Sequence, residues 1–242
     1  MVEKISLDEV IKNALSMGVK KIVVPASSAK DIDEVFELSQ KYDNVYCYLG
    51  IHPEEAKEWD EGIMDIIRKY SASSKVVGIG EIGLDYYWDK SHVELQKEIF
   101  IKQIQLGNEL NLPLNIHDRE AHKDTFDILK EYNKNSTVIM HCFSGSPEFA
   151  LECIKEGWYI ALGGVVTFKN AKKMKEVAKV VPLERLLLET DAPYLTPMPH
   201  RGEENQPAYV KFTAEEIAKI KEISFEELAK QTTQNAEKIL LI

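Results

Sequence analysis

The sequence predicts an α/β protein of the TIM (β/α)8-barrel type in which the first strand of the barrel is missing. Two observations support this prediction: apolar runs alternate with amphipathic stretches along 242 residues, and successive runs begin about 20–40 residues apart. Strands that alternate with helices form a parallel sheet, and about 250 residues is typical of such a barrel. No linker rich in Gly, Ser or Pro divides the chain, so we expect residues 1–242 to form a single domain.

Seven apolar runs predict the strands. Most are rich in β-branched or aromatic side chains, which is typical of strands buried on both faces of a parallel sheet. The runs are residues 21–24, 45–49, 76–79, 114–116, 137–140, 159–162 and 186–188. The alternative architecture is an open, doubly wound sheet, which usually carries a glycine-rich turn after its first strand. Residues 25–28, Pro-Ala-Ser-Ser, do not form such a turn.

The stretches between the runs have the spacing of amphipathic helices. Residues 92–111 carry apolar side chains at helical spacing, and Pro113 ends this helix. Two capping boxes, at residues 6–9 and 224–227, predict helices that begin near the two ends of the chain. We therefore expect the chain to open on a helix, with seven strands rather than eight after it. Such a barrel would leave two strand edges unpaired.

Charge and composition exclude several classes of protein. The chain has 30 Lys and Arg against 40 Asp and Glu, a net charge of −10, which excludes a duplex-binding protein held by a broad basic surface. No apolar run approaches the roughly 20 residues of a transmembrane helix and residues 1–4 lack an apolar stretch, so we expect neither a transmembrane helix nor a signal peptide. Cys47, Cys142 and Cys153 lack paired spacing, so we expect reduced thiols in a cytoplasmic protein.

Four groups that can bind a metal follow separate predicted strands: Glu81, His117, His141 and Asp191. Each alone has a structural explanation, such as a buried ion pair or a turn. Because strand ends converge at one mouth of a TIM barrel, the joint pattern favours a metal site. Two imidazoles and two carboxylates suit Zn²⁺, Mn²⁺ or a similar divalent ion. His52 also follows a strand, where it could bind substrate or merely shape its loop.

Several segments together form a specific set of motifs. They are Gly50-Ile51-His52-Pro53, Gly80-Glu81-Ile82-Gly83-Leu84-Asp85-Tyr86-Tyr87, His141-Cys142-Phe143-Ser144-Gly145, Glu189-Thr190-Asp191-Ala192-Pro193-Tyr194-Leu195, and Pro199-His200-Arg201-Gly202 with Asn205-Gln206-Pro207. This set resembles the signatures of the TatD family of metal-dependent deoxyribonucleases, within the amidohydrolase superfamily. The resemblance runs from about residue 5 to the C-terminus.

The resemblance implies a hydrolase that cleaves DNA phosphodiester bonds through a metal-activated water, with Zn, Mg or Mn as the ion. By the same resemblance, Glu81 is shared between two metals, and His117 and His141 complete the ligands of one of them. Asp191 binds the second metal and accepts the proton of its water. The catalytic residues are then Asp191 and Glu81, and the substrate is DNA, as single strands or at ends.

One departure from the family pattern is large. Family members begin with a strand that ends in Asp-x-His-x-His, whose histidines hold the second metal, whereas the first histidine here is His52. We therefore expect one metal rather than two and weakened activity. The expected cause is a misassigned or internal start codon, or decay of the family fold.

Residues near the mouth also suggest how substrate binds. Arg119, His200 and Arg201 could form a local positive region for the DNA backbone. Tyr86 and Tyr87 could stack on bases of a single strand or pack over the mouth. Two other functions remain open: a small-molecule hydrolase that opens an amide, lactone or phosphoester on the same scaffold, and a non-catalytic metal-binding remnant.

Overall fold

The computed structural model describes residues 5–88 and 90–242, so the interpretation of residues 1–4 lies outside the described residues. Within them, seven parallel strands pair in chain order, from β1 at one edge to β7 at the other. The strands are β1 (Ile22–Pro25), β2 (Val45–Leu49), β3 (Val76–Asp85), β4 (Leu114–Arg119), β5 (Val138–Met140), β6 (Tyr159–Leu162) and β7 (Leu186–Leu188). Every predicted run therefore forms a strand.

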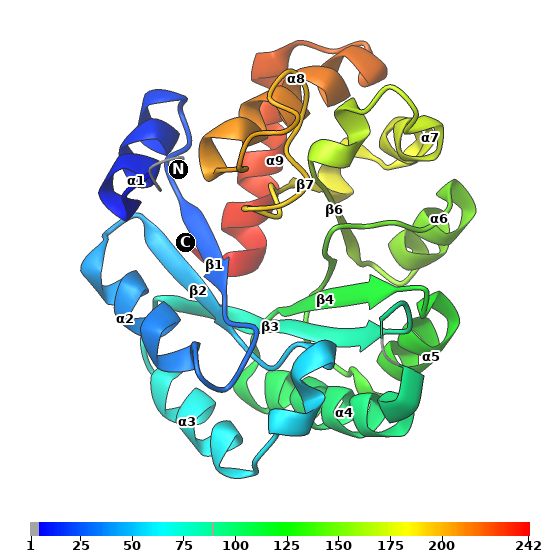
Figure 1. Ribbon diagram of the computed structural model, residues 1–242. Coiled ribbons are helices and arrows are strands. Elements are labelled where there is room, and N and C mark those ends of the chain that lie inside the picture. The colour runs from blue at the N-terminus through cyan, green and yellow to red at the C-terminus, as the bar shows by residue number, and fades with distance from the viewer. Residues whose placement is uncertain (1–4, 89) are drawn as a thin grey trace.

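The arrangement confirms the prediction of a TIM-type α/β fold: helices lie on the outer side of the curled sheet, except that the last of them runs toward its middle (Figure 1). They are α1 (Leu7–Ser16), α2 (Ile32–Lys41), α3 (Gly62–Tyr70), α4 (Val93–Leu110), α5 (His122–Tyr132), α6 (Pro147–Lys155), α7 (Lys172–Val180), α8 (Val210–Lys221) and α9 (Phe225–Leu240). Ser6 and Ser224 cap α1 and α9, because their hydroxyls accept the backbone N–H of Glu9 and Glu227 at 3.3 and 3.1 Å.

Two hydrophobic layers hold the sheet. The outer layer lies between strands and helices and includes Ile79, Phe100 and Ile104. The inner layer fills the barrel with side chains from alternate strand positions, joined by the end of α9. Its buried members are Tyr48, Val77, Ile139, Tyr159, Ala161, Leu187, Ile239 and Leu240. Apolar side chains therefore pack together inside the curled sheet, and the carboxyl ends of the strands are where a TIM-type fold carries its active site.

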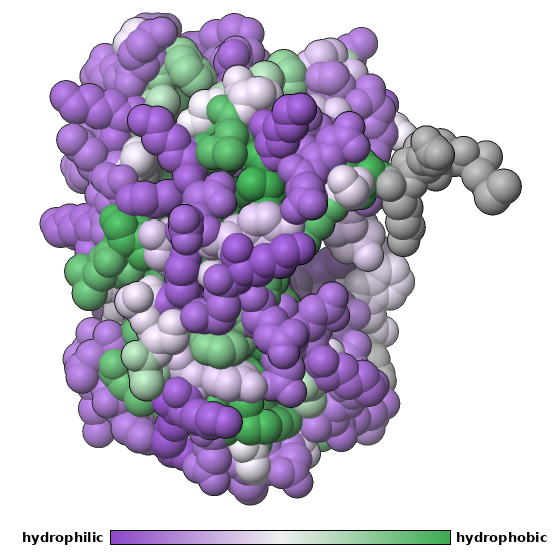
Figure 2. All heavy atoms as spheres, turned by 90° about the vertical axis from the view of Figure 1, so that its left-hand side faces the viewer, coloured by the Kyte–Doolittle hydropathy of each residue, from purple (hydrophilic) through white to green (hydrophobic). Residues whose placement is uncertain are grey.

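The outward faces of the helices meet solvent. On the side of α1 and α2, hydrophilic side chains predominate and hydrophobic ones form only scattered patches (Figure 2). None of the described helices is long and apolar enough to cross a membrane.

An irregularity in β3 positions the segment that carries Glu81. Ile79 pairs with Leu114 and Ile82 with Ile116, so β3 contains one extra residue relative to β4, as in a β-bulge. Glycines on both sides of Glu81 permit close approach to β4. A Cβ at Gly80 would lie 2.6 Å from the Cβ of Asn115, and one at Gly83, where φ is +147°, would overlap the carbonyl oxygen of His117.

We expect Gly83→Ala to lower the free energy of unfolding by about 4 kcal/mol or more, because the added Cβ overlaps backbone that cannot move aside. The control is Gly157→Ala, at φ +85° with open space around it, which should cost only about 1 kcal/mol. Urea unfolding of the two variants measures the difference. Equal losses would contradict the close packing of β3 on β4.

Candidate metal centre

Glu81 lies among three histidines from neighbouring strand ends. Its Oε1 atom is 2.8 Å from Nδ1 of His117, 3.6 Å from Nε2 of His52 and 3.6 Å from Nε2 of His141. His52 and His141 follow β2 and β5, while His117 lies in β4 and Glu81 in β3. Parallel strands point their carboxyl ends the same way, which explains how residues so far apart in sequence meet.

Asp85 holds His117 from the other side. Its Oδ2 is 2.9 Å from Nε2 of His117, so both ring nitrogens of this histidine face carboxylates. The rings of His52 and His117 lie 4.3 Å apart, edge to face. Asp85 is buried at the end of β3, which orients the imidazole of His117 between Asp85 and Glu81.

His141 is held in the same way by two further carboxylates. Its Nδ1 lies 2.6 Å from Oε2 of Glu189, and its Nε2 lies 3.3 Å from Oδ1 of Asp191. Since Glu189 takes the Nδ1 side, the Nε2 side is left facing Glu81 and Asp191. This is the arrangement by which a carboxylate fixes the tautomer and ring orientation of a ligating histidine.

Burial and neighbouring charges shift the pKa values at this centre. Burial alone would raise the pKa of Glu81, but the surrounding imidazoles lower it well below its ordinary value. Burial and the imidazole of His117 lower the pKa of His52 to about 4. For His117, hydrogen bonds to Asp85 and Glu81 outweigh burial and raise the pKa to about 9.

His141 behaves like His117. Burial would lower its pKa, but Glu189, Glu81 and Asp191 raise it well above the ordinary value. At neutral pH and without metal, Glu81 is therefore ionised, His117 and His141 are protonated, and His52 is neutral. A divalent ion would replace two protons as the charge that balances the carboxylates.

The donor set suits a transition-metal ion. Ligand atoms of His52, Glu81 and His117 all lie within 4.8 Å of one another. Imidazole nitrogens with carboxylate oxygens are the ligands that Zn²⁺, Mn²⁺ and similar ions take in hydrolases. Glu189 adds a buried oxygen, Oε1, that lacks a hydrogen-bond partner. The residues present therefore fit a divalent metal.

The structure brings together all four predicted metal ligands, Glu81, His117, His141 and Asp191. His52 was expected to bind substrate or shape its loop, yet it lies as close to Glu81 as His141 does. It is therefore also a candidate ligand.

The predicted phosphate-binding residues lie further out. Arg119 ends β4 and stacks its guanidinium 3.9 Å from the ring centroid of Tyr87. In the loop after β7, His200 pairs with Glu203 at 2.9 Å, and Arg201 lies over the ring of Phe168. In the described part of the chain, none of these three side chains forms an ion pair with Glu81.

Two carboxylates at the centre, Asp85 and Glu189, were not predicted to have a role. Glu189 could have been found, because it precedes Asp191 by two positions and alternate residues of an extended chain share a face. Asp85 follows Glu81 by four residues, but the intervening bulge hides this relation from any regular spacing.

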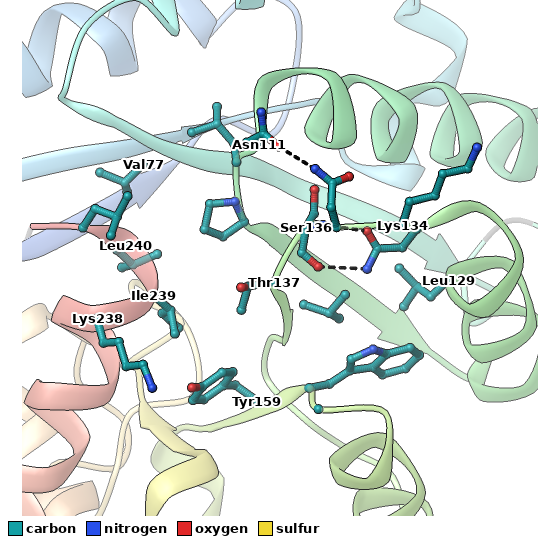
Figure 3. A pocket seen from close by; sticks show the side chains of 18 of the residues that line it. Val77, Asn111, Leu129, Lys134, Ser136, Thr137, Tyr159, Lys238, Ile239 and Leu240 are labelled. Atoms are coloured by element: carbon teal, nitrogen blue, oxygen red, sulfur yellow. Dashed lines mark hydrogen bonds between the residues drawn. The ribbon is translucent and has the colours of Figure 1, made fainter.

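A cavity of about 900 Å³ lies at the opposite end of the barrel. Figure 3 shows Tyr159 at the start of β6 and Lys238 and Ile239 near the end of α9 around it. None of the predicted site residues lines this cavity. The candidate centre is therefore the group of side chains at the carboxyl ends of the strands, where TIM barrels carry their active sites.

Comparisons with known proteins agree with this location. Residues 3–241 match the family described as TatD related DNase. The chain is 49% identical over 237 residues to the metal-dependent hydrolase YabD of Bacillus subtilis strain 168, covering 98% of this chain and 93% of the relative. It is 32% identical over 240 residues to a protein of Erwinia tasmaniensis named 3'-5' ssDNA/RNA exonuclease TatD, covering 96% and 92%.

A solved structure has the same fold. The crystal structure of YjjV, a TatD homologue from Escherichia coli K12, matches with a TM-score of 0.91 and 28% identity, covering 97% of this chain and 92% of that one.

We expect Glu81→Gln to weaken the binding of Mn²⁺ or Zn²⁺ by about 100-fold or more, because Glu81 would bind the ion directly. Loss of a residue that only supports a ligand already lowers metal affinity by about 10- to 100-fold. Isothermal titration calorimetry measures the affinity. Glu226→Gln is the matched control, since Glu226 is exposed in the first turn of α9. Unchanged affinity in Glu81→Gln would contradict the assignment.

The pKa of His117 predicts the pH dependence of stability without metal. The protonated imidazole of His117 stabilises the fold. Because its pKa is raised from 6.5 to about 9, this contribution is complete below pH 6.5 and is lost as the pH rises to about 9. We expect the free energy of unfolding of His117→Gln, measured with urea in EDTA, to fall less steeply with pH than that of the wild type. The difference in slope should be about 1 kcal/mol per pH unit across this window. Parallel profiles for the wild-type and variant proteins would contradict the protonation of His117.

Proposed function

The chain belongs to the TatD family of metal-dependent hydrolases, and we propose that it hydrolyses phosphodiester bonds in DNA, as single strands or at ends. The observation that carries this proposal is the buried carboxylate of Glu81 among the imidazoles of His52, His117 and His141, with Asp191 beside it. A relative's name, 3'-5' ssDNA/RNA exonuclease TatD, supports nucleic acid as the substrate.

We assign metal binding to Glu81, His117 and His141, with His52 and Asp191 as further candidate ligands. A divalent ion, when bound, supplies a water of lowered pKa and neutralises charge on the phosphate. Asp191 accepts the proton of the attacking water, since its carboxylate lies at the edge of the cluster and is 29% exposed. Glu189 and Asp85 are positioning residues that orient His141 and His117.

Three side chains at the mouth, Arg119, His200 and Arg201, bind the phosphate backbone in this proposal. Arg119 extends the end of β4, and His200 and Arg201 lie in the loop after β7. A guanidinium can bind phosphate through two hydrogen bonds at once, which favours the arginines for this role. A cytoplasmic location is also part of the proposal, supported by the free thiols of the three cysteines.

A small-molecule hydrolase is the second candidate, and the net charge of −10 favours it because DNA is repelled by an acidic surface. Its substrate would be a compact phosphoester, lactone or amide that enters the mouth without contact to a wider surface. A non-catalytic metal-binding protein is the third outcome to be tested.

We expect Mn²⁺-loaded protein to cleave single-stranded DNA in preference to an aryl phosphodiester or a lactone. Asp191→Asn should lower kcat by about 100- to 10,000-fold, the usual contribution of a general base. Asp127→Asn, on the exposed face of α5, is the control and should keep wild-type kcat. Hydrolysis of the lactone with intact DNA would favour the second candidate, and no hydrolysis at all would favour the third.

A further inference from the structure

Two large aromatic side chains are exposed directly after β3. Trp88 is 64% exposed and Tyr87 is 48% exposed, and their rings meet edge to face with centroids 4.8 Å apart. Tyr86, the preceding residue, instead packs against the core and donates its hydroxyl hydrogen bond to Asp124 at 2.8 Å. The aromatic faces left to solvent are thus those of Tyr87 and Trp88, and exposed apolar groups of this size commonly mark a binding site.

A cation is stacked on this aromatic pair. The guanidinium carbon of Arg119 lies 3.9 Å from the ring centroid of Tyr87 and 5.4 Å from that of Trp88. Within residues 5–88 and 90–242, no carboxylate forms an ion pair with Arg119. The guanidinium can therefore attract an anion that lies beside the two exposed aromatic side chains.

The aromatic pair is joined to the metal centre through one carboxylate. Oδ1 of Asp85 accepts the backbone N–H groups of Tyr87 at 2.9 Å and Trp88 at 3.3 Å. Oδ2 of the same side chain is 2.9 Å from Nε2 of His117, which in turn pairs with Glu81. The segment is also linked to the end of β4, because the backbone N–H of Tyr86 donates a hydrogen bond to the carbonyl of Arg119 at 2.9 Å. The exposed rings are thereby fixed next to the reaction centre.

We propose that Tyr87, Trp88 and Arg119 form an aromatic platform that binds an unpaired nucleobase next to the phosphate to be cleaved. Aromatic faces stack on any base, and the guanidinium adds attraction for the adjoining phosphate. A base inside a duplex already stacks on its neighbours and cannot lie on the platform, so the platform selects single strands and frayed ends. This inference rests on the proposed function, because it names the feature by which the same site selects its substrate.

The test measures binding separately from turnover. In an Asp191→Asn background with Mn²⁺, the affinity for a short oligothymidylate is compared with that for the same backbone carrying abasic sites. Trp88→Ala should weaken binding of the oligothymidylate roughly 5- to 150-fold, the range for loss of one stacking side chain. Trp88→Phe, which keeps an aromatic face, should bind nearly as the parent does, and Trp88→Ala should leave binding of the abasic strand unchanged.

The outcomes are distinguishable from failure of the nuclease proposal. If Trp88→Ala binds oligothymidylate as tightly as the parent, or weakens both strands equally, the platform is wrong, whatever the cleavage assay shows. Absence of oligothymidylate binding in the parent also overturns it. If the wild-type chain cleaves no DNA while base binding still depends on Trp88, the nuclease proposal fails and the platform remains a nucleobase-binding site.

Discussion

Glu81 is only 13% exposed, and a carboxylate buried to that degree keeps its charge only when counter-charges surround it. His117 and His141 supply those charges in the metal-free chain, and they keep their protons because Asp85 and Glu189 lie on their far sides. The imidazole of His117 thus faces two carboxylates, and that of His141 faces three. The arrangement assembles a compact group of ligands in advance, so that a divalent ion replaces protons rather than reorganising the site.

The backbone of β3 makes this arrangement possible. The extra residue of the bulge, together with close packing at Gly80 and Gly83, brings the carboxylates of Glu81 and Asp85 to His117 from opposite sides. Asp85 then extends the same network to the loop that carries Trp88. One strand therefore links the ligand shell, its supporting carboxylate and the exposed aromatic rings at the mouth.

The strands and the convergence of Glu81, His117, His141 and Asp191 were predictable, because apolar runs mark strands and their ends meet at one mouth. The supporting carboxylates were not. Their role depends on side-chain orientation around a bulge and a turn, which no regular spacing encodes. The closeness of His52 to Glu81 was also missed, since its loop is placed by tertiary contacts, such as the hydrogen bond from the His52 N–H to the Ser27 carbonyl.

The most direct test of the central claim is anomalous diffraction at the metal edge from crystals of the chain grown with Mn²⁺. We expect an anomalous peak within coordination distance of a Glu81 carboxylate oxygen and of at least two of the nitrogens of His52, His117 and His141. A peak elsewhere, for instance between His200 and Glu203, or no peak at a saturating concentration of Mn²⁺, would contradict the account.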